Sequence, residues 1–266
     1  MFDSIAGDYD SLNHILSLDV DKIWRKKALK QIVDAPAPAR VLDLACGTGD
    51  FSIAIAKALS RSHKRVGTPI EAHVKAPAKV PVEAQVTSTG FVTGDSGRSD
   101  LMTKGHVTGV DLSEGMLAVM REKVAKAGLT EMISIEEGDG ENLRFPDNTF
   151  DRVTIAFGIR NFENREKGLR EMLRVLKPGG RLVILELSRP ENKIIRWFYD
   201  IYFLHILPKV GGKVSGDKAA YAYLPASVAA FPGKKAFMAT MREAGFRAVT
   251  HKAFTLGICR MYTGEK

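Results

Sequence analysis

The chain has 266 residues, of which 45% are hydrophobic and 26% are charged, so it is long enough to bury a sizeable core. Its 24 glycines and 11 prolines exclude a fibrous or wholly disordered protein. Charged residues interrupt the longest apolar stretches before the roughly 18 residues of a membrane span, and we expect no secretory leader. Cys46 and Cys259 form neither a metal nor a disulfide pattern, which favours a cytoplasmic protein.

The net charge of +8 has more than one interpretation. Part of it lies in the segment KIWRKKALK, where Lys22, Lys26 and Lys30 recur at helical spacing. This pattern predicts a solvated helix face. Contact with an anionic membrane surface is the alternative, and nucleic-acid binding is a second one.

The first strand and helix frame a glycine turn. Residues 1–35 are predicted to be helical and to form a lid, and Val41–Leu44 then suits a buried strand. Gly47 and Gly49 let the backbone turn sharply, and a helix begins at Asp50. A strand, a glycine turn and a helix predict a ligand crevice at the carboxyl end of a parallel sheet.

The same turn indicates which ligand is bound. A dinucleotide fingerprint places a third glycine three residues after the second, and Ser52 occupies that position. A turn of this kind after a strand that bears an acid, Asp43, suits a nucleoside with a small charged tail. We therefore predict S-adenosylmethionine, held by Asp43, Gly47, Thr48 and Gly49; an ordinary strand-to-helix turn is the alternative.

Residues 61–105 differ from the segments on either side. They contain Pro69, Pro77 and Pro81, many small polar residues and no helical period. A loop this long inside a compact domain is functional or poorly ordered. We predict an insertion on the amino-terminal side of the sheet that touches neither cofactor nor substrate, with a hairpin at 80–92 as the alternative.

The rest of the chain alternates strands with helices, which predicts a single α/β domain, residues 1–266. We expect a doubly wound, mostly parallel, seven-stranded sheet with a C-terminal antiparallel hairpin. Residues 190–232 are rich in aromatics and predict a helical substrate cap. The predicted strands are 106–111, 133–137, 152–156 and 181–187, the helices are 114–127 (N-cap Ser113), 164–175 (N-cap Asn164) and 234–244, and the hairpin joins 247–254 to 256–264 through Thr255.

Acidic residues at two strand ends are predicted to hold the nucleoside. The acid after the second strand of such a unit lies about 20 residues beyond the glycines and accepts from ribose hydroxyls. Asp111 lies 62 residues after Gly49, but only 16 remain once residues 61–106 are left out. Asp139 follows the third strand and is predicted to accept from the adenine amino group, beside Phe145. A helix-capping role for Asp111 and a turn role for Asp139 are the alternatives.

Five segments together resemble one enzyme family. They are YDSLNHILSLDVDKIW at 9–24, the glycine turn at 43–50, GDGENLRFPDNTFD at 138–151, FGIRNF at 157–162 and RVLKPGGRLVILELS at 174–188. In this order they resemble the quinone-ring C-methyltransferases of menaquinone and ubiquinone biosynthesis, over nearly all of the chain except 61–105. The resemblance implies the class I S-adenosylmethionine-dependent methyltransferase fold. It also implies cofactor contacts at Thr48, Asp111, Asp139 and Gly140, and through the backbone of Ala156.

The chemistry of ring methylation suggests catalytic residues. Transfer of a methyl group from a sulfonium is an in-line displacement that needs no metal, but the ring carbon must be made nucleophilic by ionising a neighbouring hydroxyl. Arg160 and Asn161, just past the fourth predicted strand, fit the roles of phenolate stabiliser and water-positioning group. Tyr9 is predicted to close over the site from the lid.

We therefore expect C-methylation of a polyprenylated hydroquinone, with demethylmenaquinol as the preferred acceptor. A ubiquinone precursor or another lipid-like acceptor is the alternative within enzymes. A basic nucleic-acid-binding or nucleic-acid-modifying protein is the alternative of another class, although no NPPY-type tetrapeptide follows the fourth predicted strand. Peripheral contact with the inner face of the membrane and a homodimer remain open.

Overall fold

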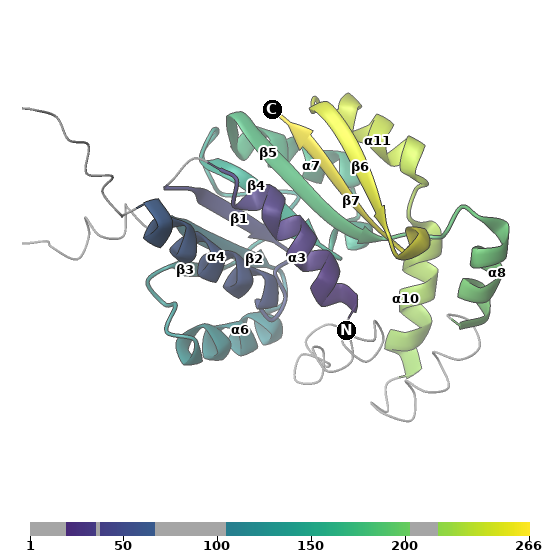
Figure 1. Ribbon diagram of the computed structural model, residues 1–266, viewed down its shortest axis with the longest axis horizontal. Helices are drawn as coiled ribbons and strands as arrows, with labels where there is room; N and C mark the ends of the chain where they lie inside the picture. The colour runs from purple at the N-terminus through teal and green to yellow at the C-terminus, as the bar shows by residue number, and fades with distance from the viewer. Residues whose placement is uncertain (1–19, 36–37, 67–104, 203–217) are drawn as a thin grey trace, which may run out of the picture.

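The computed structural model describes residues 20–35, 38–66, 105–202 and 218–266 (Figure 1). Residues 1–19 of the predicted lid, with Tyr9, lie outside the described residues, as does the predicted insertion from residue 67 to residue 104.

A seven-stranded sheet has the order β3-β2-β1-β4-β5-β7-β6 (Figure 1). The first five strands pair in parallel, and β7 lies antiparallel between β5 and β6. This confirms the predicted doubly wound sheet and its closing hairpin. The strands are β1 (Arg40–Leu44), β2 (His106–Asp111), β3 (Ile133–Glu137), β4 (Phe150–Ala156), β5 (Leu176–Leu187), β6 (Arg247–Phe254) and β7 (Cys259–Glu265).

Helices cover both faces of this sheet (Figure 1). One face packs against α3 (Val20–Ile32), α4 (Asp50–Val66) and α6 (Glu114–Lys126), and the other against α7 (Arg165–Val175) and α11 (Lys234–Glu243). Two further helices, α8 (Lys193–Ile201) and α10 (Lys218–Ala230), lie together at one end of the molecule (Figure 1). Short 3-10 turns follow β4 (η1, Ile159–Asn161) and join β6 to β7 (η3, Thr255–Gly257).

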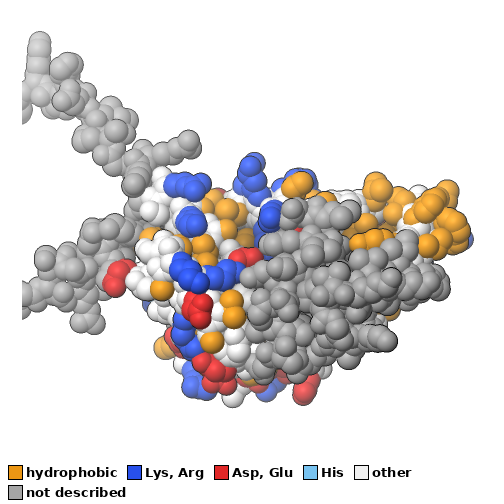
Figure 2. Space-filling view, turned by 90° about the horizontal axis from the view of Figure 1, so that it is seen from below, with side chains coloured by type: hydrophobic (Ala, Val, Ile, Leu, Met, Phe, Trp, Pro, Cys, Tyr) orange, Lys and Arg blue, Asp and Glu red, His pale blue; other side chains and the backbone are white. Residues whose placement is uncertain are grey.

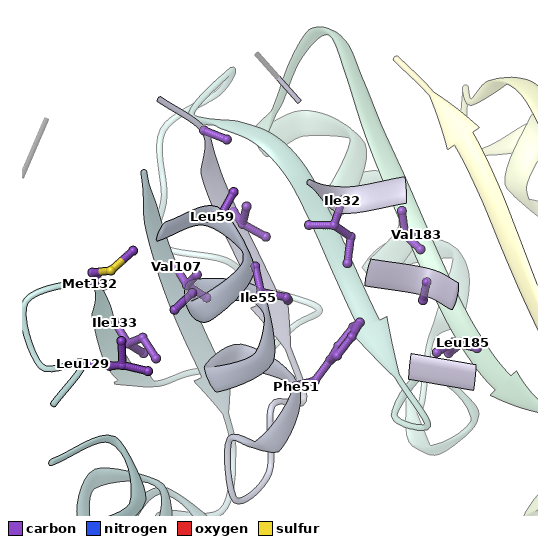
Figure 3. Packing of buried hydrophobic residues seen from close by; sticks show 14 of the residues in the cluster. Ile32, Phe51, Ile55, Leu59, Val107, Leu129, Met132, Ile133, Val183 and Leu185 are labelled. Atoms are coloured by element: carbon purple, nitrogen blue, oxygen red, sulfur yellow. The ribbon is translucent and has the colours of Figure 1, made fainter. Parts of the chain in front are cut away.

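The core on the α3–α4 face is built from helical side chains one turn apart. Phe51, Ile55 and Leu59 of α4 and Ile32 of α3 are buried against the sheet (Figure 3). In β5, Val183 belongs to this cluster whereas Leu182 and Ile184 belong to the opposite one. Central strands buried on both faces explain why β5 reads as a continuous apolar run.

Two predicted helix starts are confirmed by their capping bonds. Ser113 accepts a hydrogen bond from the amide of Met116 at 3.2 Å, and Asn164 accepts one from the amide of Lys167 at 2.9 Å. Side-chain oxygens at these positions satisfy amides that have no partner within the first turn of a helix.

Three predicted boundaries were wrong. Strand β4 begins at Phe150 rather than at Arg152. Strand β5 begins at Leu176 rather than at Arg181, because the residues before Arg181 form an irregularity in the β4–β5 pairing and not a turn. A Cβ on Gly180 would lie 2.8 Å from the carbonyl oxygen of Lys177, so this irregularity requires glycine. Helix α4 continues past Arg61 to Val66, because no glycine or proline interrupts residues 61–66.

The basic helix face is solvated as predicted, since Lys22, Lys26 and Lys30 of α3 are exposed. Among the described helices, none combines the length and the hydropathy that crossing a bilayer would require.

Arg174 on α7 fixes the loop between β3 and β4, so its loss should destabilise the fold. It donates to the carbonyl oxygens of Leu143 and Phe145 at 2.9 and 2.7 Å and pairs with Glu171 and Asp147, both at 2.8 Å. We expect Arg174→Gln to lower the free energy of unfolding by about 2 kcal/mol, since charge-assisted bonds to partly buried groups are lost. Urea denaturation measures this change.

Arg170, on the same helix, provides the matched control. It pairs with Glu166 at 3.5 Å across a surface where its side chain is 64% exposed. Such pairs contribute little, so Arg170→Gln should stay within about 0.5 kcal/mol of the parent. Equal losses in the two variants would contradict the role given to Arg174.

Candidate functional site

A cavity of about 440 Å³ opens at the carboxyl ends of β1, β4 and β5. The glycine turn lines one part of it, and α3, α8, α10 and η3 line the rest. The strand order reverses at β1, which has β2 on one side and β4 on the other. Ligands of open parallel sheets bind beside such a reversal, so the cavity lies where the cofactor was predicted.

The glycine turn has the backbone that its sequence predicts. Gly47 and Gly49 have φ values of 55° and 83°, which glycine adopts without strain. A Cβ on Gly49 would lie 2.4 Å from Cγ of Met120 on α6, so the turn also packs too closely for a side chain. Gly47 lines the cavity, whereas Gly49 is buried beneath it. The amide of Gly49 donates to the carbonyl of Cys46 at 3.0 Å and closes the turn.

Asp43 brings a buried carboxyl group to the cavity wall. The hydroxyl of Ser52 donates to it at 2.6 Å. Burial, which outweighs the opposing hydrogen bond from Ser52, raises the pKa of Asp43 to about 7. A cation in the cavity would lower this pKa again, so the carboxyl group would ionise.

The start of α4 is held from a neighbouring helix. Thr48 and Asp50 both line the cavity. Lys123 of α6 donates to the Thr48 hydroxyl at 3.2 Å and forms an ion pair with Asp50. These contacts fix the first turn of α4, whose amides favour a negatively charged ligand group.

Asp111 touches the glycine turn but does not line the cavity. Its carboxylate accepts from the amide of Gly47 at 2.8 Å and from that of Ser113 at 2.9 Å. The end of β2 is thereby joined to the turn after β1. The structure thus supports the predicted position of Asp111 beside the glycines, while its contact with ribose remains a prediction.

Asp139 lies at a separate small hollow beyond β3, and Gly140 follows it without lining the hollow. Asp139 is exposed, lines this hollow and accepts from the amide of Glu141 at 2.8 Å, as a turn residue does. A Cβ on Gly140 would lie 2.6 Å from the ring of Phe162, so glycine is needed for packing there. Phe145 lines the same hollow and packs edge-to-face on Phe150. The adenine contact predicted here remains a prediction.

Part of the cavity is lined by aromatic side chains. Trp24 of α3 and Phe157, which follows Ala156 of β4, have ring centroids 6.2 Å apart. Trp24 also donates to the Thr255 hydroxyl at 2.9 Å, which joins α3 to η3. Helix α8 and the residue after it contribute Phe198, Tyr199 and Tyr202. This part of the cavity suits a flat, largely apolar ring.

Backbone strain is concentrated around this cavity. Ala45, Phe157, Thr255 and Leu256 have φ values of 48°, 63°, 44° and 57°, and all four line the cavity. Non-glycine residues rarely adopt this conformation, and such residues cluster at functional sites. The strain comes from three separate connections, which supports a functional role for the cavity as a whole.

Arg160 lines the cavity and forms a buried ion pair. Its Nη1 atom donates to Oε1 of Glu186 at 2.8 Å and also to the carbonyl of Phe157. Its amide donates to Oε2 of Glu186 at 3.1 Å. The side chain of Arg160 is 8% exposed and that of Glu186 is fully buried. The carboxylate balances the guanidinium, so Arg160 is available as a directional donor more than as a net positive charge.

Asn161 lies next to Arg160 in η1 but does not line the cavity. Its Oδ1 atom accepts from the hydroxyl of Tyr223 on α10 at 2.9 Å.

The structure brings some of the predicted site residues to one cavity. They are Asp43, Gly47, Thr48, Ala156 and Arg160.

Several cavity residues were missed from the sequence. Trp24 and Phe157 lie in two of the segments that carry the family resemblance, 9–24 and 157–162, but were not predicted as site residues. Thr255 and Leu256 come from a hairpin connection far along the chain. Glu186 could have been found, because an acid inside the apolar run RLVILEL predicts a buried charge with a partner.

Comparison with solved structures shows the fold. The chain is similar to a SAM-dependent methyltransferase from Aquifex aeolicus, with a TM-score of 0.53 and 19% identity over 90% of this chain and 88% of the other. It is also similar to the [4+2]-cyclase SpnF, with a TM-score of 0.59 and 16% identity over 91% and 80% of the two chains.

Comparison with curated proteins is more specific. The chain is 42% identical to the ubiquinone/menaquinone biosynthesis C-methyltransferase UbiE of Geobacter sulfurreducens, over all of this chain and 87% of that protein. It is 39% identical to the demethylmenaquinone methyltransferase of Bacteroides fragilis strain ATCC 25285, over all of this chain and 91% of that one. The profile of the ubiE/COQ5 methyltransferase family matches residues 1–266. The chain therefore belongs to the ubiE/COQ5 methyltransferase family.

Proposed function

We propose that this protein transfers the methyl group of S-adenosylmethionine to a ring carbon of a polyprenylated hydroquinone, with demethylmenaquinol as the preferred acceptor. The observation that carries the proposal is one cavity that joins the glycine turn to an aromatic chamber containing Arg160. The names of the relatives from Geobacter and Bacteroides supply the acceptor class. The first of these names also covers ubiquinone, so a benzoquinol precursor is the alternative acceptor.

The residues around the glycine turn fit this cofactor. When bound, the cofactor supplies an electrophilic methyl group on a positively charged sulfur. Gly47 lines the cavity and has no side chain to obstruct a ligand, Gly49 closes the turn beside it, and Asp43 would face the ammonium group of the cofactor. Thr48 and the start of α4 would hold its carboxylate, and Asp111 and Asp139 would hold its ribose and adenine. Ala156 would contribute a backbone contact.

The aromatic chamber would hold the acceptor ring. Trp24 and Phe157 would contact its faces, and α8 and α10 would cover it as part of the cap predicted at 190–232. Tyr9 and the rest of the lid, 1–35, would close the opening. A hydroquinone hydroxyl would lose its proton as the neighbouring carbon takes the methyl group and the methyl–sulfur bond breaks, and Arg160 would donate to the developing phenolate oxygen. The methylated carbon would then lose its hydrogen as a proton, which restores the aromatic ring. Asn161 would orient the water that receives the hydroxyl proton.

A membrane contact would explain an apolar surface beside this cavity. On α8, Ile194, Trp197 and Phe198 are 70%, 60% and 62% exposed. Figure 2 shows hydrophobic side chains gathered at the end of the molecule where α8 lies. Phe198 also lines the cavity, so the exposed surface continues into it. We propose that α8 rests on the bilayer that dissolves the prenyl tail of the substrate.

Activity on quinols tests the proposed reaction directly. The purified protein should methylate a reduced, short-chain prenyl naphthoquinol faster than the matching benzoquinol, with mass spectrometry of the product as the measurement. Asn161→Ala should lower kcat by about two orders of magnitude with unchanged cofactor affinity. Exposed Glu163, two residues away, provides the control as Glu163→Ala. If the unaltered protein methylates neither quinol, the acceptor class is wrong.

The raised pKa of Asp43 predicts a pH dependence of cofactor binding. Below about pH 7 the free protein holds a proton on Asp43, and a bound ammonium group would expel it. Affinity should therefore rise with pH up to about 7 and then level off. Titration calorimetry at pH 6 in buffers of different ionisation enthalpy should show proton release on binding.

A variant that lacks the Ser52 hydroxyl tests the direction of this pH dependence. The hydrogen bond from Ser52 lowers the pKa of Asp43, so Ser52→Ala should move the pH midpoint of binding upward. Affinity that is independent of pH between 5.5 and 8.5, with no proton release, would show that Asp43 does not face the cation.

Vesicle binding tests the α8 surface. The unaltered protein should co-sediment with anionic vesicles, and the double variant Trp197→Ser with Ile194→Ser should lose most of that binding, because two exposed apolar anchors are removed. Neither residue lines the cavity, so activity on a detergent-dispersed quinol should be retained. Equal sedimentation of the two proteins would rule out α8 as the contact.

A further inference from the structure

Two side chains of α10 contact the pair of residues proposed for catalysis. Tyr223 and Ser227 are four residues apart, so they project from the same face of the helix. Tyr223 donates to Oδ1 of Asn161 at 2.9 Å, and Ser227 accepts from Nε of Arg160 at 3.3 Å. One helical face therefore meets both residues of η1 through side-chain hydrogen bonds.

These contacts determine how the two side chains are oriented. The hydrogen bond from the hydroxyl of Tyr223 to the amide oxygen of Asn161 holds that side chain against α10. Ser227 is itself fixed, since its hydroxyl donates to the carbonyl of Leu224 at 3.0 Å and so turns its lone pairs toward Arg160.

Three elements together hold the guanidinium of Arg160. Glu186 on β5 binds Nη1, the carbonyl of Phe157 after β4 also accepts from Nη1, and Ser227 on α10 binds Nε. An arginine side chain otherwise loses considerable rotamer freedom when it binds a ligand. Fixing it in advance removes that loss from the catalytic step.

We propose that Tyr223 and Ser227 are positioning residues for methyl transfer, which act through Asn161 and Arg160. Leu224, between them in sequence, lines the cavity, so α10 contacts the acceptor chamber as well as the catalytic pair. The inference rests on the proposed function, because it takes the roles of Arg160 and Asn161 from it.

Kinetics of conservative variants test the proposal. Tyr223→Phe and Ser227→Ala should each lower kcat by about tenfold, the effect of one hydrogen bond on a transition state. The KM for S-adenosylmethionine and the melting temperature should stay unchanged. The kcat–pH profile of each variant should also shift to higher pH, because a poorly aligned Arg160 stabilises the phenolate less. Ser227→Thr keeps the hydroxyl and should restore most of the activity.

A double-mutant cycle separates positioning from a general structural role. If Tyr223 acts through Asn161, adding Tyr223→Phe to Asn161→Ala should lower kcat no further. Thr240 on α11, whose hydroxyl donates to the carbonyl of Ala236 at 3.2 Å, provides a control as Thr240→Ala. This control should leave kcat and its pH profile unchanged.

Three results would overturn the proposal while the proposed function stands. These are unchanged kcat in both α10 variants, losses that follow the melting temperature, and additive losses in the double mutant. Failure of the proposed function is a separate observation, namely that the unaltered protein methylates no quinol.

Discussion

The ion pair between Arg160 and Glu186 is the interaction on which the aromatic part of the cavity, the proposed acceptor site, depends. Glu186 is fully buried in the central sheet and accepts from the Arg160 side chain, the Arg160 amide and the amide of Leu187. A carboxylate without such donors would be too costly to bury. The pair therefore constrains the path of the chain after β4, because η1 must stay within reach of β5. That constraint places Arg160 on the cavity wall and Asn161 beside α10.

The part of the cavity at the glycine turn, the proposed cofactor site, depends on different contacts, which are local to the ends of β1 and β2. Asp111 accepts from the amide of Gly47, and Asp43 accepts from Ser52 within the first turn of α4. Both carboxylates thus order the backbone around a turn that has positive φ at Gly47 and Gly49. A site built from backbone groups needs rigid support, since small displacements weaken every contact. The close packing of Gly49 against Met120 supplies part of that support.

Much of the fold could be predicted from the sequence because its signals are local. Alternating strands and helices, the capping residues Ser113 and Asn164 and the closing hairpin were found from short-range patterns and are confirmed. Gly47, Thr48 and Arg160 were predicted as site residues from motifs next to strand ends, and all three line the cavity. The partners of Arg160, Asn161 and Trp24 could not be found in this way, because Ser227, Tyr223 and Thr255 reach the site only through tertiary packing. The start of β5 was misjudged because a Pro-Gly-Gly segment predicts a turn, whereas pairing with β4 absorbs it as an irregularity.

The division between the two sides of the cavity also explains how one fold serves different reactions. A methyltransferase and a cyclase both share this architecture at less than 20% identity, so the sheet and its edge do not specify the acceptor. In this chain the acceptor side is formed by α3, η3, α8 and α10, which come from segments before and after the sheet's parallel half. Of these elements, α3 also packs directly against α4, the helix that follows the glycine turn. The acceptor proposed for this protein would be recognised by these four elements, whose contacts are the least local in sequence.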